Sequence, residues 1–491
     1  MLFYTPEFLV FSMLLLATLA LVKRDEPRKV VLLVASYGFY MWWNPLFIVL
    51  IAFATAVNYM LGKAIDESDD DRRRGVLLAT SLVSSLGLLA YFKYTGFLAD
   101  TTLVLMRELG FAVHWSSIEI TLPVGISFYT FQALSYTIDV YRRDLRATAS
   151  PIDFALYIAF FPQLVAGPIV RAANFLPQLR ERIRISCDQT TFFLIARGLA
   201  KKVLVADNLA LLPDVVFGTP EAFPSIVIWL ASACFAVQIY CDFSGYSDIA
   251  IGTARILGFD LMKNFRRPYL AHSIAEFWHR WHISLSTWFR DYLYIPMGGN
   301  RVRRTHHYAN LFSVFLLSGL WHGANWTFLA WGAIHGAYLV SGLVLVPLRE
   351  RLERWIPFAR TSWPRRAIAI FTTFHLTLLA WVFFRADSIS DAMILIQQGF
   401  SGLGTQLSAM DIRSIYQASV IAVGIPKMEF ILSILAVSFV IAADLFAEWG
   451  PAANTRDRRA RIMRFAGYDL LVLMIILFGA YGQQQFIYFQ F

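Results

Sequence analysis

The sequence predicts an all-α integral membrane protein, and three observations support this prediction. Hydrophobic residues make up 57% of the 491 residues, whereas charged residues make up only 16%. Aromatic side chains are frequent, with 42 phenylalanines and 14 tryptophans. Apolar segments recur along the whole chain, and about 20 apolar residues in a helix are enough to cross a bilayer. We therefore expect a single polytopic membrane domain over residues 1–491.

The apolar segments follow one another with short polar loops between them. The first has no basic residues before it and is expected to be a retained helix rather than a signal peptide. Several segments are too short for a full crossing, so some must be re-entrant, tilted or interfacial. In chain order the segments are 8–22, 30–43, 46–61, 76–91, 123–138, 152–165, 192–205, 226–240, 243–257, 311–329, 331–346, 367–384, 430–446 and 470–481.

An acidic motif lies between the apolar segments 226–240 and 243–257. Asp242 and Tyr246 are four residues apart and would share a face of a helix. One interpretation is a carboxylate relay for protons, because acids inside membranes often mark proton paths. The alternative is a paired structural acid that fixes a break between two helices.

Residues 259–310 mix charged and aromatic residues too densely for a helix that crosses lipid. On a continuous helix Phe277, Trp281 and Trp288 fall on one side, and Arg280 falls on another. Such a helix lies at the membrane interface or lines a wet cavity. His282 in this segment is either a functional residue or an interfacial histidine that bonds to backbone.

His322 lies in the run 311–330, which is otherwise apolar and long enough to cross the bilayer. Hydrocarbon does not solvate an imidazolium, so His322 either packs between helices or has a function. On a continuous helix Ser318 and Asn325 would lie on its face and orient the ring. A neutral imidazole held in this way can take a proton from an attacking hydroxyl and pass it to a leaving group.

The net charge and the positions of the histidines indicate whether the chain binds lipid, nucleic acid or metal. The net charge of +9 fits contact with anionic membrane lipid better than binding of nucleic acid, which we do not expect. Seven of the nine histidines fall between His272 and His335, and His279 and His282 have a spacing that metal ligands use. No H-E-x-x-H pattern accompanies them, so we expect no metal.

Several sequence motifs together resemble the signature of the membrane-bound O-acyltransferase (MBOAT) family. Among its branches they are most similar to the bacterial alginate O-acetylation type. The motifs cover nearly the whole chain and are LPVGISFY at 122–129, AGP at 166–168, DFSGYSD at 242–248, RWHISLSTWFRDYLY at 280–294, GGNR at 298–301, GLWHGAN at 319–325 and FIYFQF at 486–491.

The resemblance implies a multi-helix bundle with a central funnel and re-entrant or interfacial helices. It implies a catalytic region at about 259–346, followed by terminal helices at about 367–491. His322 matches the histidine that is the proposed catalytic base of the family, and His282 matches a second histidine of the same region. The expected substrate-channel residues are Trp321, Asn325, Ser318, Trp281 and Asp242.

The resemblance also implies a substrate and a location. The expected acyl donor is cytosolic acetyl-CoA, and the expected acceptor is an extracytoplasmic polysaccharide such as alginate, another exopolysaccharide or a cell-wall glycan. A separate periplasmic acetyltransferase is expected as a partner, because no segment here could form a soluble domain for delivery. The expected location is the bacterial cytoplasmic (inner) membrane.

Two other functions remain as alternatives at this stage. A proton-coupled transporter would use the buried acids and histidines as a proton path, but it would also predict paired broken helices in matching halves. No such symmetry is visible in the sequence. The second alternative is a non-catalytic scaffold of a polysaccharide export complex.

Overall fold

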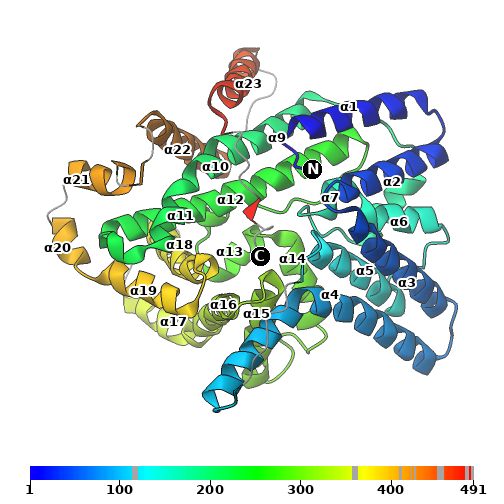
Figure 1. Ribbon diagram of the computed structural model, residues 1–491, viewed down its shortest axis with the longest axis horizontal. Coiled ribbons are helices and arrows are strands. Elements are labelled where there is room, and N and C mark those ends of the chain that lie inside the picture. The colour runs from blue at the N-terminus through cyan, green and yellow to red at the C-terminus, as the bar shows by residue number, and fades with distance from the viewer. Residues whose placement is uncertain are drawn as a thin grey trace. The chain divides into compact units, whose positions relative to one another are not determined.

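The computed structural model describes residues 1–112, 120–355, 363–408, 412–421, 423–424, 427–449, 458–480 and 486–487. Helices dominate these ranges, and no strand occurs within them, which confirms the all-α class (Figure 1). Of the FIYFQF motif, only Phe486 and Ile487 lie within the described residues.

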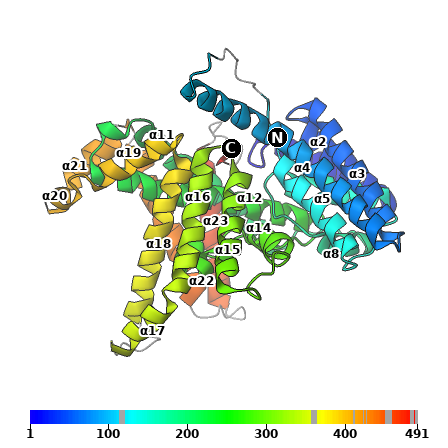
Figure 2. The ribbon, with the colours of Figure 1, turned by 90° about the horizontal axis from the view of Figure 1, so that it is seen from below.

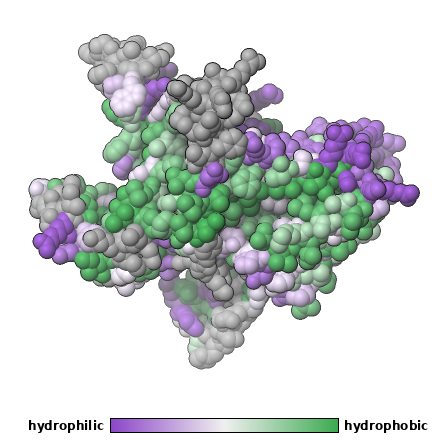
Figure 3. Space-filling model, turned by 90° about the horizontal axis from the view of Figure 1, so that it is seen from above, coloured by the Kyte–Doolittle hydropathy of each residue, from purple (hydrophilic) through white to green (hydrophobic). Residues whose placement is uncertain are grey.

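Five helices in the described ranges are long and apolar enough to cross a membrane. Only 17% of the most apolar window of Asp71–Glu108 is buried, so most of its apolar side chains face outward, as lipid contact requires. Figure 3 shows hydrophobic residues over much of the visible surface. The five helices are Pro45–Asp66, Asp71–Glu108, Ser225–Ile256, Trp326–Val344 and Trp363–Arg385; shorter apolar helices are Pro6–Leu21, Phe430–Phe446 and Asp469–Phe478.

The chain divides into two compact units. The first contains residues 1–195 and 249–263, and the second contains 196–248 and 264–491. The expectation of one catalytic domain over 1–491 stays a prediction. Elements of the first unit are α1 (Pro6–Leu21), α2 (Asp25–Met41), η1 (Pro45–Phe47), α3 (Ile48–Asp66), α4 (Asp71–Glu108), α5 (Ile126–Tyr141), α6 (Pro151–Ala159), α7 (Phe161–Leu164), α8 (Ala172–Phe175), η2 (Leu176–Arg180) and most of α9 (Gln189–Leu199).

The second unit contains the candidate site. Its elements are η3 (Ala200–Ala206), α10 (Asp207–Leu209), α11 (Leu211–Gly218), η4 (Pro220–Ala222), most of α12 (Ser225–Ile256), η5 (Pro268–Leu270), α13 (Ile274–Arg280), α14 (Ile283–Phe289), η6 (Arg290–Tyr294), α15 (Arg304–His322), α16 (Trp326–Val344), α17 (Val346–Trp355), α18 (Trp363–Arg385), α19 (Ile389–Phe400), α20 (Leu403–Ser408), α21 (Ile412–Tyr416), η7 (Gln417–Ile421), α22 (Lys427–Trp449) and α23 (Arg458–Phe478).

In the first unit, polar side chains join α3, α4 and α5. The Asn58 amide on α3 donates to Ser85 over 3.0 Å and accepts from Ser81 over 2.7 Å. Ser81 also lies 3.0 Å from the hydroxyl of Thr137 on α5. Helices in lipid gain no hydrophobic attraction for one another, so buried hydrogen bonds of this kind hold them together.

In the second unit, α15 and α16 form a hairpin whose backbones touch. A Cβ atom on Gly319 would lie 2.2 Å from the carbonyl oxygen of Phe328, and one on Gly332 would lie 2.4 Å from that of Phe315. Small residues at such positions let membrane helices approach closely. Figure 2 shows α15, α16 and α18 side by side, and α16 contacts both neighbours.

Two sequence expectations about helix boundaries were wrong. Residues 226–240 and 243–257 form one helix, α12, rather than two segments. The acid between them does not break the helix, because Asp242 is paired with Lys202. Conversely, the run 311–330 is not one crossing: α15 ends at His322, and α16 starts at Trp326. Gly323 between them has an extended backbone, with φ of −163°.

Candidate active site

His322 is the last residue of α15 and is buried among aromatic rings. The residue is only 4% exposed. The centre of its ring lies 4.9 Å from that of Trp331, 5.1 Å from that of Trp321 and 5.4 Å from that of Phe384. The imidazole is thus enclosed by apolar surfaces contributed by α15, α16 and α18.

The expected arrangement of Ser318 and Asn325 around His322 is only partly present. Ser318 lies one turn earlier on α15 and is buried. Asn325 is not on the same helix, because it is the residue that caps the start of α16. Its side chain accepts a hydrogen bond from the backbone of Thr327 over 3.1 Å and donates one to the carbonyl of Asp387 over 2.9 Å. Its channel role stays a prediction.

His282 lies in a sharp break between α13 and α14. The expectation of one continuous interfacial helix was wrong, because His282 has a left-handed backbone with φ of 41°. The residue is fully buried, and burial lowers the pKa of its imidazole to about 3. The ring is therefore neutral at physiological pH and can accept a hydrogen bond.

Asn264 explains the break at His282. Its side-chain oxygen accepts hydrogen bonds from the backbone N–H of Ser284 over 3.2 Å and from the hydroxyl of Ser284 over 2.9 Å. The same oxygen lies 3.2 Å from Nδ1 of His282. The backbone carbonyl of Asn264 also accepts from Ile283 over 2.9 Å. Sequence reasoning missed Asn264, because it lies 18 residues before His282, outside any helix.

The geometry around Asn264 selects one neutral form of His282. The amide oxygen has no proton to give, so the Nδ1 that faces it carries the hydrogen and donates. Nε2 is then the unprotonated ring nitrogen. In this tautomer Nε2 of His282 can accept a hydrogen bond.

Trp321 links the two predicted catalytic histidines. Its ring centre lies 6.0 Å from that of His282 and 5.1 Å from that of His322. Trp281, also buried, stacks on Phe277 and contacts Trp381 at 5.1 Å. The structure thus brings His282, His322 and both tryptophans into one aromatic cluster of the second unit.

A third buried histidine, His335, also belongs to this cluster. It lies on α16 and is fully buried. Its ring centre is 4.9 Å from that of Trp331. The ring centre of Trp331 is also 4.9 Å from that of His322. The indole N–H of Trp278 donates to Nδ1 of His335 over 3.3 Å. No motif identified His335 from the sequence, because thirteen residues on a continuous helix would place it about 220° around the axis from His322.

Asp242 lies in a buried charge cluster. Lys202 pairs with Asp242 at 2.9 Å and with Asp207 at 2.8 Å. The second oxygen of Asp242 accepts the backbone N–H of Ile487 over 2.8 Å, which anchors this segment to α12. Burial raises the pKa of Asp207 to about 7 despite the nearby Lys202. The contacts of Asp242 are structural, and its channel role stays a prediction.

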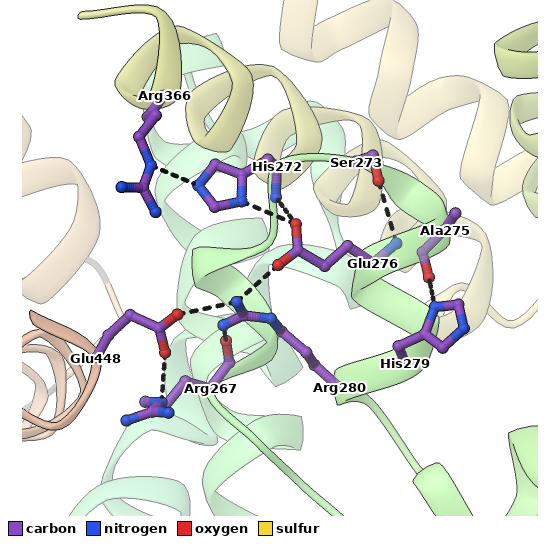
Figure 4. A network of polar contacts seen from close by, with 9 residues as sticks. All are labelled: Arg267, His272, Ser273, Ala275, Glu276, His279, Arg280, Arg366 and Glu448. Carbon is purple, nitrogen blue, oxygen red and sulfur yellow. Dashed lines mark hydrogen bonds and ion pairs between the residues drawn. The ribbon is translucent and has the colours of Figure 1, made fainter. Parts of the chain in front are cut away.

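A network of ion pairs supports the segment that carries His282 (Figure 4). Arg280 on α13 pairs with Glu276 at 2.6 Å and with Glu448 of α22 at 2.9 Å. Glu276 also accepts from His272 over 2.8 Å, and Arg366 of α18 donates to the other ring nitrogen of His272 over 3.3 Å. The network therefore ties α13 to α18 and α22.

The two histidines with metal-ligand spacing do not form a site together. His279 is exposed and contacts the backbone carbonyl of Ala275 at 2.7 Å, whereas His282 is buried beyond the helix break. Within the part of the chain that the structure describes, no group of three histidine, cysteine or acidic residues is placed to hold a metal ion.

Comparisons with known proteins agree with this architecture. The model of the membrane-bound O-acyltransferase family matches residues 142–380, which include both His282 and His322. A probable alginate O-acetylase of Pseudomonas putida is 35% identical over the full length of both chains. A probable alginate O-acetylase of Azotobacter vinelandii is 40% identical over 82% of this chain and 78% of its own.

A more distant relative has another named acceptor. The peptidoglycan O-acetyltransferase of Helicobacter pylori is 33% identical over 82% of this chain and 80% of its own length. The family match and the full-length relatives agree with the membrane helices and the histidine motifs. The chain is an O-acyltransferase and belongs to the membrane-bound O-acyltransferase family.

Proposed function

We propose that this protein takes acetyl groups from cytosolic acetyl-CoA and passes them across the bacterial inner membrane for O-acetylation of an extracytoplasmic polysaccharide. The observation that carries the proposal is the pair of buried imidazoles, His282 and His322, joined through Trp321. The relatives support the choice of acetyl group and acceptor, because their names describe O-acetylation of alginate and of peptidoglycan.

The proposed reaction transfers an acyl group from sulfur to oxygen. The neutral ring of His322 takes the proton of an acceptor hydroxyl as its oxygen attacks the thioester carbonyl. The new C–O bond forms, the C–S bond breaks, and the proton passes to the departing thiolate. His282 holds Nε2 unprotonated in the same cluster and assists this proton transfer.

The proposed acceptor lies on the far side of the membrane from the donor. The acetyl group reaches an alginate-like exopolysaccharide or a cell-wall glycan, directly or through a separate periplasmic acetyltransferase. Such a partner fits the described part of the chain, where long apolar helices leave no soluble unit for polymer delivery.

The test uses the purified protein in lipid nanodiscs with acetyl-CoA and a glycan acceptor, with and without a periplasmic acetyltransferase as the partner. Release of free CoA thiol measures the reaction. We expect His322→Gln to lower the rate by roughly 100-fold or more, the scale of general acid–base catalysis. His282→Gln should also lower it. The control is His375→Gln, since His375 is an exposed residue of α18.

Two outcomes would contradict parts of the proposal, and a third would decide between its two routes to the glycan. Wild-type protein that consumes no acetyl-CoA under these conditions would remove acetyl-CoA as the donor. Full activity of a folded His322→Gln variant would remove His322 as the base. Transfer to the partner without transfer to the glycan would identify the partner as the immediate acceptor.

A further inference from the structure

Helix α16 carries three buried polar side chains along one face. Thr327, Trp331 and His335 follow one another at intervals of four residues, so they lie above one another on the helix. Thr327 is 1% exposed, and the other two are fully buried. At 1.5 Å per residue, the three span roughly 12 Å of the helix. We call these three residues the α16 polar stripe.

Each residue of the α16 polar stripe has an atom that lacks a hydrogen-bond partner among the described residues. These atoms are Oγ1 of Thr327, Nε1 of Trp331 and Nε2 of His335. Buried polar atoms are nearly always bonded, because leaving one unbonded costs the free energy of its lost hydration. Three in succession on a membrane helix therefore indicate a place where bonding groups from outside the chain arrive.

Two of the three atoms of the α16 polar stripe that have no partner within the described part of the chain, those of Trp331 and His335, are hydrogen-bond donors. The indole of Trp331 can only donate. In His335, Nδ1 accepts from Trp278, so the hydrogen of the neutral ring is on Nε2, which donates. The ligand of such a stripe must present acceptors.

The stripe lies beside the proposed base. Trp331 is 4.9 Å from His322 between ring centres, and it also contacts Trp381 and Phe384 of α18. A ligand bound to the α16 polar stripe is therefore surrounded by apolar aromatic rings. A sugar hydroxyl would bring a hydrogen that itself needs an acceptor, whereas a carbonyl oxygen only accepts.

We propose that the α16 polar stripe binds the carbonyl oxygens of the acyl donor, which follow one another along the helix from the terminal thioester carbonyl to the two amide carbonyls of the CoA arm. This inference rests on the proposed function, because it takes a CoA thioester as the donor. It makes Thr327, Trp331 and His335 residues of the donor site, on a helix whose sequence shows only apolar periodicity.

The test compares two threonines on neighbouring membrane helices. Thr327→Val and Thr377→Val each remove one buried hydroxyl and keep the side-chain shape. Thr377 on α18 is also fully buried, but its hydroxyl donates to the carbonyl of Thr373 over 2.8 Å. Only the Thr327 hydroxyl has no such partner in the described structure. The two substitutions therefore separate ligand binding from internal bonding.

The measurements are the melting temperature without ligand and the affinity for a CoA thioester analogue in which a methylene replaces the sulfur. For Thr327→Val we expect an unchanged or higher melting temperature and roughly three- to tenfold weaker binding, the worth of one neutral hydrogen bond. Trp331→Phe, which keeps an aromatic ring, should weaken binding by a similar factor. Thr377→Val should leave the affinity unchanged.

The outcomes separate the two proposals. Unchanged analogue affinity in both Thr327→Val and Trp331→Phe would overturn the stripe as a donor site, while the proposed function would stand. Equal losses of affinity in Thr327→Val and Thr377→Val would also overturn it, since a general packing effect would then explain both. Wild-type protein that binds neither acetyl-CoA nor the analogue would remove the proposed donor itself.

Discussion

The side-chain oxygen of Asn264 lies 3.2 Å from Nδ1 of His282 and also accepts two hydrogen bonds from Ser284. One amide thus sets both the backbone turn and the protonation pattern of the imidazole. A residue with this role acts through His282 rather than on a substrate. Its effect should appear in the pH dependence of the reaction.

Asn264→Asp should move the acid limb of the pH–rate profile toward neutral pH. Burial holds the pKa of His282 at about 3 in the native protein, so its ring stays neutral across the physiological range. A carboxylate beside Nδ1 favours the protonated ring and raises that pKa. The rate at pH 7 should then fall and recover at higher pH. An unchanged profile in a folded variant would show that Asn264 does not control this histidine.

Asn264→Ala removes the acceptor altogether and serves as the companion variant. We expect a loss of rate of about tenfold or more, because the tautomer with unprotonated Nε2 is no longer favoured. The KM for the donor should change little. Nitrogen NMR of histidine-labelled protein, with His282→Gln to identify the signal, reports the tautomer independently of activity.

Glu276→Gln should destabilise the protein at neutral pH and reduce its sensitivity to acid. Burial alone would raise the pKa of Glu276, but hydrogen bonds from His272 and the ion pair with Arg280 lower it below its usual 4.5. A lowered folded-state pKa gives stability above pH 4.5 that is lost as the pH falls through the folded value. For this partly exposed pair we expect a loss of about 1 kcal/mol in the free energy of unfolding.

The matched control for Glu276 is Glu67→Gln. Glu67 and Lys63 form a 3.8 Å pair in which both side chains are more than half exposed. Melting temperatures between pH 3 and pH 7 should be almost unchanged by this substitution. An equal effect of both substitutions would mean that the network in Figure 4 stabilises the protein no more than an exposed surface ion pair does.

Gly332→Ala should weaken the α15–α16 hairpin. The new methyl group would lie 2.4 Å from the carbonyl oxygen of Phe315, so the two backbones must separate. We expect a cost of about 1–3 kcal/mol, the range for overpacking, and lower activity because His322 ends α15. Gly342→Ala on the same helix meets no atom within 4 Å and should be neutral or slightly stabilising. Thermal unfolding of both variants in nanodiscs measures the difference.

Lys202→Met should be far more damaging than Asp242→Asn. Removal of Lys202 leaves Asp207 and Asp242 buried without their shared cation, which costs on the order of 3–5 kcal/mol. After Asp242→Asn the lysine still pairs with Asp207, and the amide oxygen can still accept the N–H of Ile487. Membrane abundance and melting temperature should rank the two variants in this order. The reverse order would assign the cluster a role other than charge balance.

Some of the site could be predicted from sequence because its signals are local. Apolar composition predicts the helices, and the motifs around His282 and His322 identify both residues. The predicted helices were wrong where the helical periodicity was assumed to continue across a break in the helix. Trp281 and His282, and Gly323 to Asn325, leave the helical conformation, and no proline marks either break in the sequence.

The remaining parts depend on contacts between distant positions. Asn264 acts on a residue in another element, and His335 on α16 joins the cluster through Trp278, which lies 57 positions earlier on α13. Asp242 continues a helix instead of breaking it because Lys202, 40 positions earlier, neutralises it. Such pairings are products of tertiary folding, so a single sequence does not reveal them.

The end of α15 at His322 has an electrostatic consequence. The last carbonyl groups of a helix carry partial negative charge, and they favour a cation nearby by roughly 0.3–1 kcal/mol, or about 2 kcal/mol where solvent is scarce. In the proposed reaction His322 is neutral at rest and positive only while it holds the proton. The dipole of α15 therefore stabilises the protonated form of His322. A histidine in the middle of an unbroken transmembrane helix would lack this stabilisation.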